Sequence, residues 1–113
     1  MEALLIGIGG AVGAVSRYLI GLLLGKTSFP WATLVVNALG SFILGLVLFA
    51  EGTSTLQLLV AVGFCGAFTT FSSFSFQTVR LWERDKQILA IVNAVGNIVI
   101  SLSAFTVAWQ FIL

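Results

Sequence analysis

Residues 63–76 read Gly-Phe-Cys-Gly-Ala-Phe-Thr-Thr-Phe-Ser-Ser-Phe-Ser-Phe, in the middle of a hydrophobic segment. Glycine and β-branched threonine both disfavour an uninterrupted helix, and here they stand beside consecutive serines. Within a bilayer, irregular backbone is tolerated only where protein buries it or where it lines a cavity. The stretch therefore predicts a membrane helix that is broken in its middle and turns carbonyl and hydroxyl groups towards something small and polar.

The composition of the 113-residue chain is that of an integral membrane protein. Hydrophobic residues make up 59% and charged residues 8%, which leaves too little polar surface for a soluble domain of this size. A net charge of +1 provides no basic surface, so we expect no nucleic-acid partner. With no His and one Cys, the chain predicts neither a disulfide framework nor a zinc site.

Four segments are long and apolar enough to cross a membrane, which takes about 20 residues each. Trp31, Trp82 and Trp109 fall near the expected ends of these segments, as in an aromatic belt. The third segment contains the break, so neither of its halves can span the membrane alone. We expect one all-α transmembrane domain over residues 1–113, with spans at about 3–24, 31–50, 55–81 and 87–111.

Small residues recur four positions apart in the first two spans, at Gly9 and Gly13 and at Ser41 and Gly45. This spacing lets helix backbones approach closely. It has two explanations, which are packing inside one chain and an interface between chains. Because four short spans enclose little space for a protected pore, we expect an oligomer.

Ionisable groups are almost absent from the expected spans. The four acidic residues map to a terminus or to loops: Glu2, Glu51, Glu83 and Asp85. Without a carboxylate or His at membrane depth, a proton relay lacks its usual carriers. Arg17 alone lies well inside a span, where its side chain either snorkels to the interface or attracts anions into a vestibule.

Neutral polar side chains recur at four-residue intervals in two spans: Thr33, Asn37 and Ser41 in the second, and Asn93, Asn97 and Ser101 in the fourth. Four-residue spacing places each set on one helix face. Asn is costly in hydrocarbon unless it is paired, so both faces are expected to contact protein or water. The residues either bond helices together or donate hydrogen bonds along a pathway, and two complete sets beside a broken helix favour the pathway.

Phe71 and Phe74 are three residues apart, so they share one face if the helix resumes there. Core packing is the ordinary role of such a pair. An aromatic ring also has an electropositive edge, against which an anion can rest. A small, strongly hydrated anion has to exchange its water for many weak donors without being trapped by a full positive charge.

With these motifs the chain resembles the CrcB/Fluc family of fluoride channels over essentially its whole length. The matching features are the four spans and three sequence groups: Gly13-Ala14 before Arg17-Tyr18, Asn37 with Gly40, and Gly63–Gly66 followed by Thr69–Ser75. The resemblance implies an antiparallel dimer with two pores and a central structural sodium ion. It also implies a multi-pass channel of the plasma membrane, and not an enzyme, that gives passive efflux of cytoplasmic fluoride and reduces its toxicity.

The resemblance implies a role for individual residues as well. The carbonyls of Gly66 and Thr69 would bind the sodium ion together with the same groups of the second subunit. Phe71 and Phe74 would offer their ring edges to fluoride, and Asn37 would donate a hydrogen bond. Further residues of the implied fluoride pathway are Ser72, Ser73, Asn93, Asn97 and Ser101, with Arg17 near the vestibule.

The basic residues leave the identity of the second subunit open. If both termini lie on one side of the membrane, all five Lys and Arg residues lie at or near the other side. The positive-inside rule then predicts a single orientation, whereas an antiparallel homodimer needs both. The partner is therefore either a second copy of this chain or a homologous chain of opposite orientation.

A small dual-topology multidrug or cation exporter is the alternative function. Such a transporter exchanges protons for cations through a carboxylate inside the membrane, and this chain has none there. A scaffold without transport would leave the polar helix faces unexplained. We therefore expect a fluoride channel that interacts with the fluoride ion, the lipid bilayer and a second channel subunit.

Overall fold

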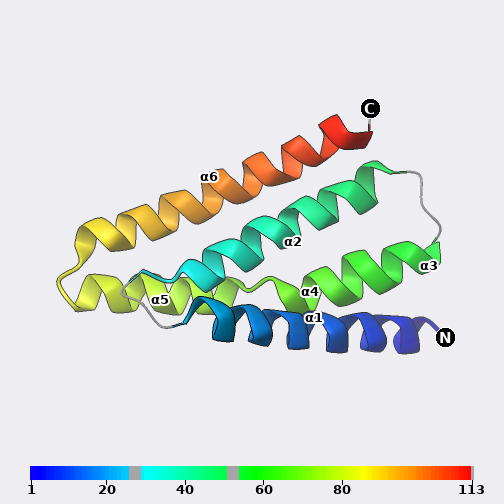
Figure 1. Ribbon diagram of the computed structural model, residues 1–113, viewed down its shortest axis with the longest axis horizontal. Coiled ribbons are helices and arrows are strands. Elements are labelled where there is room, and N and C mark those ends of the chain that lie inside the picture. The colour runs from blue at the N-terminus through cyan, green and yellow to red at the C-terminus, as the bar shows by residue number, and fades with distance from the viewer. Residues whose placement is uncertain (26–28, 51–53, 113) are drawn as a thin grey trace.

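The computed structural model describes residues 1–25, 29–50 and 54–112. Figure 1 shows helical spans that run side by side along the long axis, with both chain ends at the same end of the molecule. Three spans are single helices: α1 (Glu2–Leu24), α2 (Trp31–Phe49) and α6 (Gln87–Ile112). The third is assembled from α3 (Ser54–Leu56), the π-helix η1 (Gln57–Cys65), α4 (Gly66–Phe68) and α5 (Phe71–Glu83).

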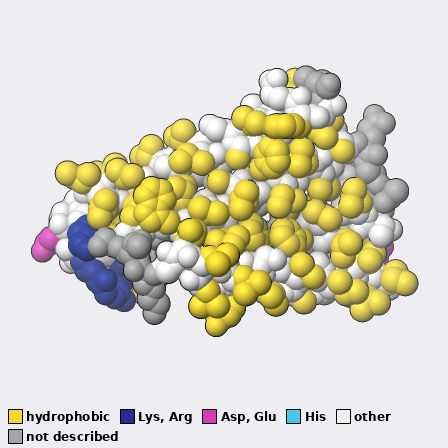
Figure 2. Space-filling view, in the orientation of Figure 1, with side chains coloured by type: hydrophobic (Ala, Val, Ile, Leu, Met, Phe, Trp, Pro, Cys, Tyr) yellow, Lys and Arg dark blue, Asp and Glu magenta, His cyan; other side chains and the backbone are white. Residues whose placement is uncertain are grey.

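The predicted all-α membrane architecture is confirmed. The described ranges contain four helical segments long and apolar enough to cross a membrane, and each of their bounds lies within two residues of the expected one. Large apolar side chains are exposed along all four spans. Figure 2 shows hydrophobic side chains over most of the visible face, with Lys and Arg gathered at one end. That surface suits a lipid environment along its length and water at its ends.

The third span is interrupted at Thr69 and Thr70. Both residues have extended backbone, with φ −81° and ψ 159° at Thr69 and φ −148° and ψ 119° at Thr70. The Thr70 side chain caps α5, because its Oγ1 accepts a hydrogen bond from the Ser73 N–H at 3.1 Å. Gly66 keeps helical dihedral angles, with φ −61° and ψ −36°. The chain thus leaves the helix three residues after Gly66, at the paired threonines.

Glycines of α1 let its backbone pack against the first half of the third span. A Cβ atom at Gly9 would overlap the carbonyl oxygen of Leu59, and one at Gly13 would overlap the carbonyl oxygen of Phe64. Both glycines are buried inside the single chain. Of the two explanations for their spacing, packing within the chain is therefore the one observed for α1.

Glycines of α2 hold that helix against α6 and against the break. A Cβ atom at Gly45 would lie 2.7 Å from the Ala108 Cβ and 2.8 Å from the Phe105 carbonyl oxygen. Five residues earlier, a Cβ atom at Gly40 would overlap the Thr69 side chain. The absence of side chains at these two positions brings the polar face of α2 beside the interrupted backbone.

Candidate functional site: the cavity at the helix break

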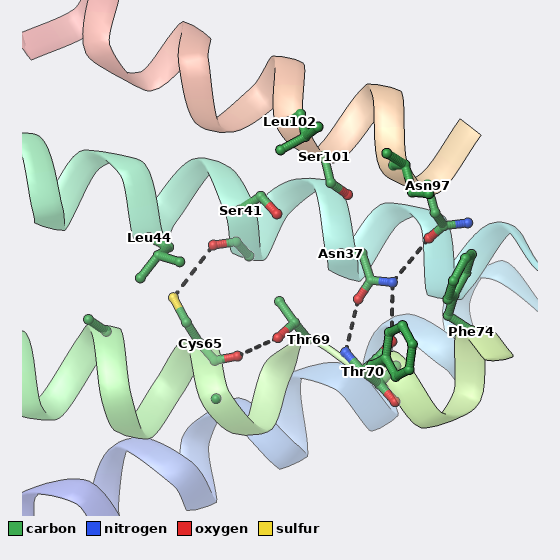
Figure 3. A pocket seen from close by; sticks show the side chains of 15 residues that line it. Asn37, Ser41, Leu44, Cys65, Thr69, Thr70, Phe74, Asn97, Ser101 and Leu102 are labelled. Atoms are coloured by element: carbon green, nitrogen blue, oxygen red, sulfur yellow. Dashed lines mark hydrogen bonds between the residues drawn. The ribbon is translucent and has the colours of Figure 1, made fainter. Parts of the chain in front are cut away.

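A cavity of about 520 Å³ lies beside the break, between α2, α6 and the third span (Figure 3). It brings together several of the residues that the sequence singled out: Asn37, Gly66, Thr69, Phe71, Phe74, Asn97 and Ser101. No Asp, Glu, Lys or Arg of the described ranges is among the residues that line it. Its polar groups are neutral amides, hydroxyls, one thiol and backbone carbonyls.

Asn37 bridges the break and α6. Its Oδ1 accepts a hydrogen bond from the Thr70 N–H at 2.9 Å, while its Nδ2 donates to the Thr70 carbonyl at 3.2 Å and to Asn97 Oδ1 at 3.0 Å. Figure 3 shows these three residues turned towards one another. A primary amide has two N–H donors, and both are used here. The implied donation from Asn37 to fluoride stays a prediction, and it would require one of these bonds to open.

The asparagines of α6 satisfy one another's polar groups. Asn97 Nδ2 donates to the Asn93 carbonyl at 2.8 Å and to Asn93 Oδ1 at 2.9 Å. Asn93 Nδ2 in turn donates to Thr78 Oγ1 at 2.8 Å. Asn97 is 4% exposed and Asn93 is 0% exposed, so both amides are buried, while Thr78 is half-buried. Such pairing removes most of the cost of an amide in an apolar environment.

The break deprives two backbone carbonyls of their helical partners. In a continuous α-helix the Thr70 N–H would donate to the Gly66 carbonyl and the Ser73 N–H to the Thr69 carbonyl. Here those two N–H groups donate to Asn37 Oδ1 and to Thr70 Oγ1. Neutral carbonyl oxygens are ligands that a hard cation prefers. The donor set therefore fits the implied sodium ion, and among the described residues no group of three or more His, Cys, Asp or Glu side chains provides a different kind of metal site.

The two phenylalanines predicted to share a face both line the cavity. Their ring centroids are 5.8 Å apart and the ring planes are inclined by 48°. The Phe71 side chain is 78% exposed in the single chain, whereas Phe74 is partly buried. The pair is thus placed at the edge of the cavity and not in the core.

Two hydroxyl groups complete the polar lining. Ser41 and Ser101 project into the space between α2 and α6 (Figure 3). Among the buried side-chain nitrogen and oxygen atoms of the described residues, Ser101 Oγ is the one without a hydrogen-bond partner. A buried unsatisfied hydroxyl is costly. This one is available to a ligand in the cavity.

Other predicted residues lie elsewhere. Ser72, Ser73 and Asn93 are not among the residues that line the cavity. Ser72 Oγ is 3.3 Å from Thr70 Oγ1, so it contacts the cap of α5. Arg17 is exposed on α1, about two turns before the end of that helix.

Sequence reasoning missed the roles of three threonine side chains. Thr70 is the N-cap of α5, which a hydroxyl residue directly before a resumed helix could have indicated. Thr78 joins α5 to Asn93, and Thr33 Oγ1 donates to Gln77 Oε1 at 2.6 Å. No local pattern reveals the last two contacts, because their partners lie on other helices.

Comparison with known proteins places the chain in a family. Residues 4–109 match the family described as CrcB-like protein, Camphor Resistance (CrcB). Three relatives are called fluoride-specific ion channel FluC 2. The protein of Haloarcula marismortui is 51% identical, and the match covers 98% of this chain and 93% of the relative. The protein of Natronomonas pharaonis is 45% identical, with 92% of this chain and 88% of the relative covered. The protein of Clostridium acetobutylicum is 38% identical, with 93% of this chain and 92% of the relative covered. With matches that cover nearly its whole length and four helices able to cross a membrane, the chain belongs to the CrcB-like family of multi-pass membrane proteins.

Proposed function

We propose that this chain forms a fluoride-selective channel of the cell membrane, which lets cytoplasmic fluoride leave passively and so reduces its toxicity. The cavity at the break carries this proposal, because it combines neutral donors with two aromatic rings and has no charged lining side chain among the described residues. The name of the relatives, fluoride-specific ion channel, supports it.

The chemistry of the cavity suits a small anion. Ring edges of Phe71 and Phe74 and the Ser101 hydroxyl offer weak positive charge that replaces part of the hydration shell. None of them holds the ion as firmly as a fixed cation would, so the ion can also leave. Fluoride enters a cell as neutral HF and dissociates there, and a negative-inside membrane potential drives the anion outwards without coupling to another ion.

The proposal includes a structural sodium ion at the carbonyls of Gly66 and Thr69, which have lost their helical donors. Such an ion would neutralise the exposed carbonyl dipoles and stabilise the interrupted backbone. A ligand that binds only the folded protein raises its unfolding temperature. The unfolding midpoint in detergent should therefore be higher in sodium chloride than in N-methyl-D-glucamine chloride of equal ionic strength, and equal midpoints would speak against the site.

A second, antiparallel subunit is the remaining part of the proposal. Phe71 is 78% exposed at the edge of the cavity. Gly66 is exposed as well, with no atom within 4 Å of an added Cβ. Both positions leave room for a partner at the break, either another copy of this chain or a homologous chain. A partner there would supply the second pair of carbonyls to the sodium ion.

Ion efflux from liposomes tests the function directly. Purified protein is reconstituted with fluoride or chloride inside, and release is followed with ion-selective electrodes. We expect fast fluoride release and little chloride release, because the lining offers donors without a fixed positive charge. Equal rates for the two anions would contradict the proposal.

The exporter alternative finds no support. Glu2, Glu83 and Asp85 lie at a helix end or in the turn between α5 and α6, and Glu51 lies outside the described residues. A proton-coupled exporter needs a carboxylate within the membrane. The relatives also carry the name of a fluoride channel.

A further inference from the structure

A continuous chain of hydrogen bonds connects the helix break at Thr70 with Thr78, about two turns further along α5. It starts at the backbone of Thr70 and passes through Asn37 of α2 to Asn97 of α6. From there it runs through Asn93 and returns to the third span at Thr78. We call these five residues the polar chain. It spans three helices with side-chain contacts of 3.2 Å or less.

Thr78 closes the polar chain onto the backbone that carries the aromatic pair. Its Oγ1 accepts a hydrogen bond from Asn93 Nδ2 and donates to the Phe74 carbonyl, both at 2.8 Å. The start of α5 at Thr70 and its second turn at Phe74 are therefore attached to the same set of side chains. These contacts fix the position and rotation of the helix segment that presents Phe71 and Phe74 to the cavity.

The inner residues of the polar chain use their donor groups within the chain or lie away from the cavity. Asn97 lines the cavity, but both protons of its Nδ2 go to Asn93. Asn93 is 0% exposed, and neither Asn93 nor Thr78 is among the lining residues. The placement of Asn93 and Thr78 therefore does not support direct contact with an ion in the cavity.

We infer that Asn93 and Thr78 are positioning residues, which set the geometry of the break and of the two phenylalanine rings without touching the transported ion. The inference rests on the proposed fluoride channel and adds residues whose effect is indirect. In buried polar networks each member orients the next, so removing one member disturbs those beyond it. Thr78 lies outside the cavity and is for that reason the informative position.

The test uses the isosteric substitution Thr78→Val, which removes the hydroxyl and keeps the shape. Thr106→Val on α6 is the matched control, because Thr106 Oγ1 makes the same kind of bond, to the Leu102 carbonyl at 2.8 Å, on an exposed face. Thr78→Ser restores the hydroxyl. Fluoride efflux is measured per folded protein, after gel filtration, in liposomes that carry equal amounts of each variant.

We expect Thr78→Val to slow fluoride efflux about tenfold, since it leaves the Asn93 Nδ2 donor without its acceptor and removes the hydroxyl donor from the Phe74 carbonyl. Thr78→Ser and Thr106→Val should conduct like the wild type. The double variant Thr78→Val with Asn93→Ala should be no slower than the slower single variant, because one cut already interrupts the polar chain. If Thr78→Val does not fold, Thr78→Ala replaces it.

Three results from the single variants would overturn the inference while leaving the proposed function intact: wild-type efflux from Thr78→Val, failure of Thr78→Ser to restore efflux, or an equal loss in Thr106→Val. Effects of Thr78→Val and Asn93→Ala that simply multiply would also contradict it, because independent contacts behave in that way. A wild-type protein that releases no fluoride would overturn the channel function and this inference together.

Discussion

At the scale of single residues, the side chain of Asn37 connects parts of the site that no local sequence pattern would bring together. It bonds to both backbone groups of Thr70 and to Asn97, and so ties the break to two other helices. Its orientation depends on its neighbours, because the Oδ1 and Nδ2 groups have different partners. Residues that line the cavity, such as Phe71 and Phe74, depend on this arrangement for their position.

Replacing either cavity phenylalanine by isoleucine should abolish fluoride efflux or slow it greatly, while the protein stays folded. Phe71→Ile and Phe74→Ile keep apolar bulk but remove the ring edge. Phe76→Ile is the matched control on the same helix, because Phe76 is exposed and does not line the cavity. Fluoride efflux is measured from liposomes that contain equal amounts of each variant. Wild-type rates in both cavity variants would show that the two rings serve only packing.

Asn37→Asp should lower fluoride efflux sharply at neutral pH, and further than Asn37→Ala does. An ionised carboxylate has no donor for the Thr70 carbonyl or for Asn97 Oδ1. Its charge also repels an anion strongly in a site shielded from water. Efflux is measured from acid to alkaline pH, with recovery expected only where the carboxyl is protonated. Normal conduction over the whole range would show that position 37 does not face the ion.

At the scale of helices, the bundle depends on close backbone contacts and on one interrupted span. Gly9 and Gly13 let α1 approach η1, and Gly40 lets α2 approach the break. Thr70 ends the extended segment by capping α5. The contacts of Gly9 and Gly13 involve backbone atoms that cannot move aside, so added side-chain atoms there would separate whole helices.

Gly13→Ala should therefore destabilise the protein by about 1–3 kcal/mol, as overpacking of a close interface does. Its Cβ would overlap the Phe64 carbonyl. Gly7→Ala and Gly21→Ala on the same helix are the controls, since an added Cβ meets no atom within 4 Å at either position. Alanine there should be neutral or stabilise the helix slightly. Thermal unfolding in detergent distinguishes the sites, and equal midpoints for all three variants would contradict the predicted packing.

At the scale of the whole molecule, charge is distributed unevenly between the two ends. The described Arg80, Arg84 and Lys86 lie where α5 meets α6, and Lys26 lies outside the described residues. Both chain ends lie at the opposite end of the molecule (Figure 1), and Figure 2 shows the basic side chains at the α5–α6 end. A cavity of about 410 Å³ there is lined in part by Arg80 and Arg84. This end can attract anions, and if the chain adopts a single orientation, the positive-inside rule predicts that this end faces the cytoplasm.

A cysteine added at the N-terminus reports the orientation of the chain. For the antiparallel homodimer, we predict labelling by impermeant thiol reagents from both sides of the membrane when the chain is expressed alone. The unmodified chain is the control, because its one cysteine, Cys65, is 4% exposed. Labelling from one side only, with fluoride efflux that requires a second homologous chain, would instead establish the heterodimer.

Much of this protein follows from local sequence properties. Low charge and four long apolar segments indicate a helical membrane protein, and the glycines, threonines and serines of residues 63–76 indicate that the third span is interrupted within that stretch. Four-residue spacing also places Asn93, Asn97 and Ser101 on one face. These features depend on residues close together in the chain, so pattern and propensity are enough to predict them.

The partners of the polar groups depend on how the helices pack. Asn37 reaches Thr70 over 33 positions and Asn97 over 60, and Asn93 reaches Thr78 over 15. Helical periodicity indicates which face an amide occupies, but not which atom of another helix lies opposite it. That is set by the close glycine contacts that fix helix spacing, because a hydrogen bond forms only within a few tenths of an ångström of its preferred length.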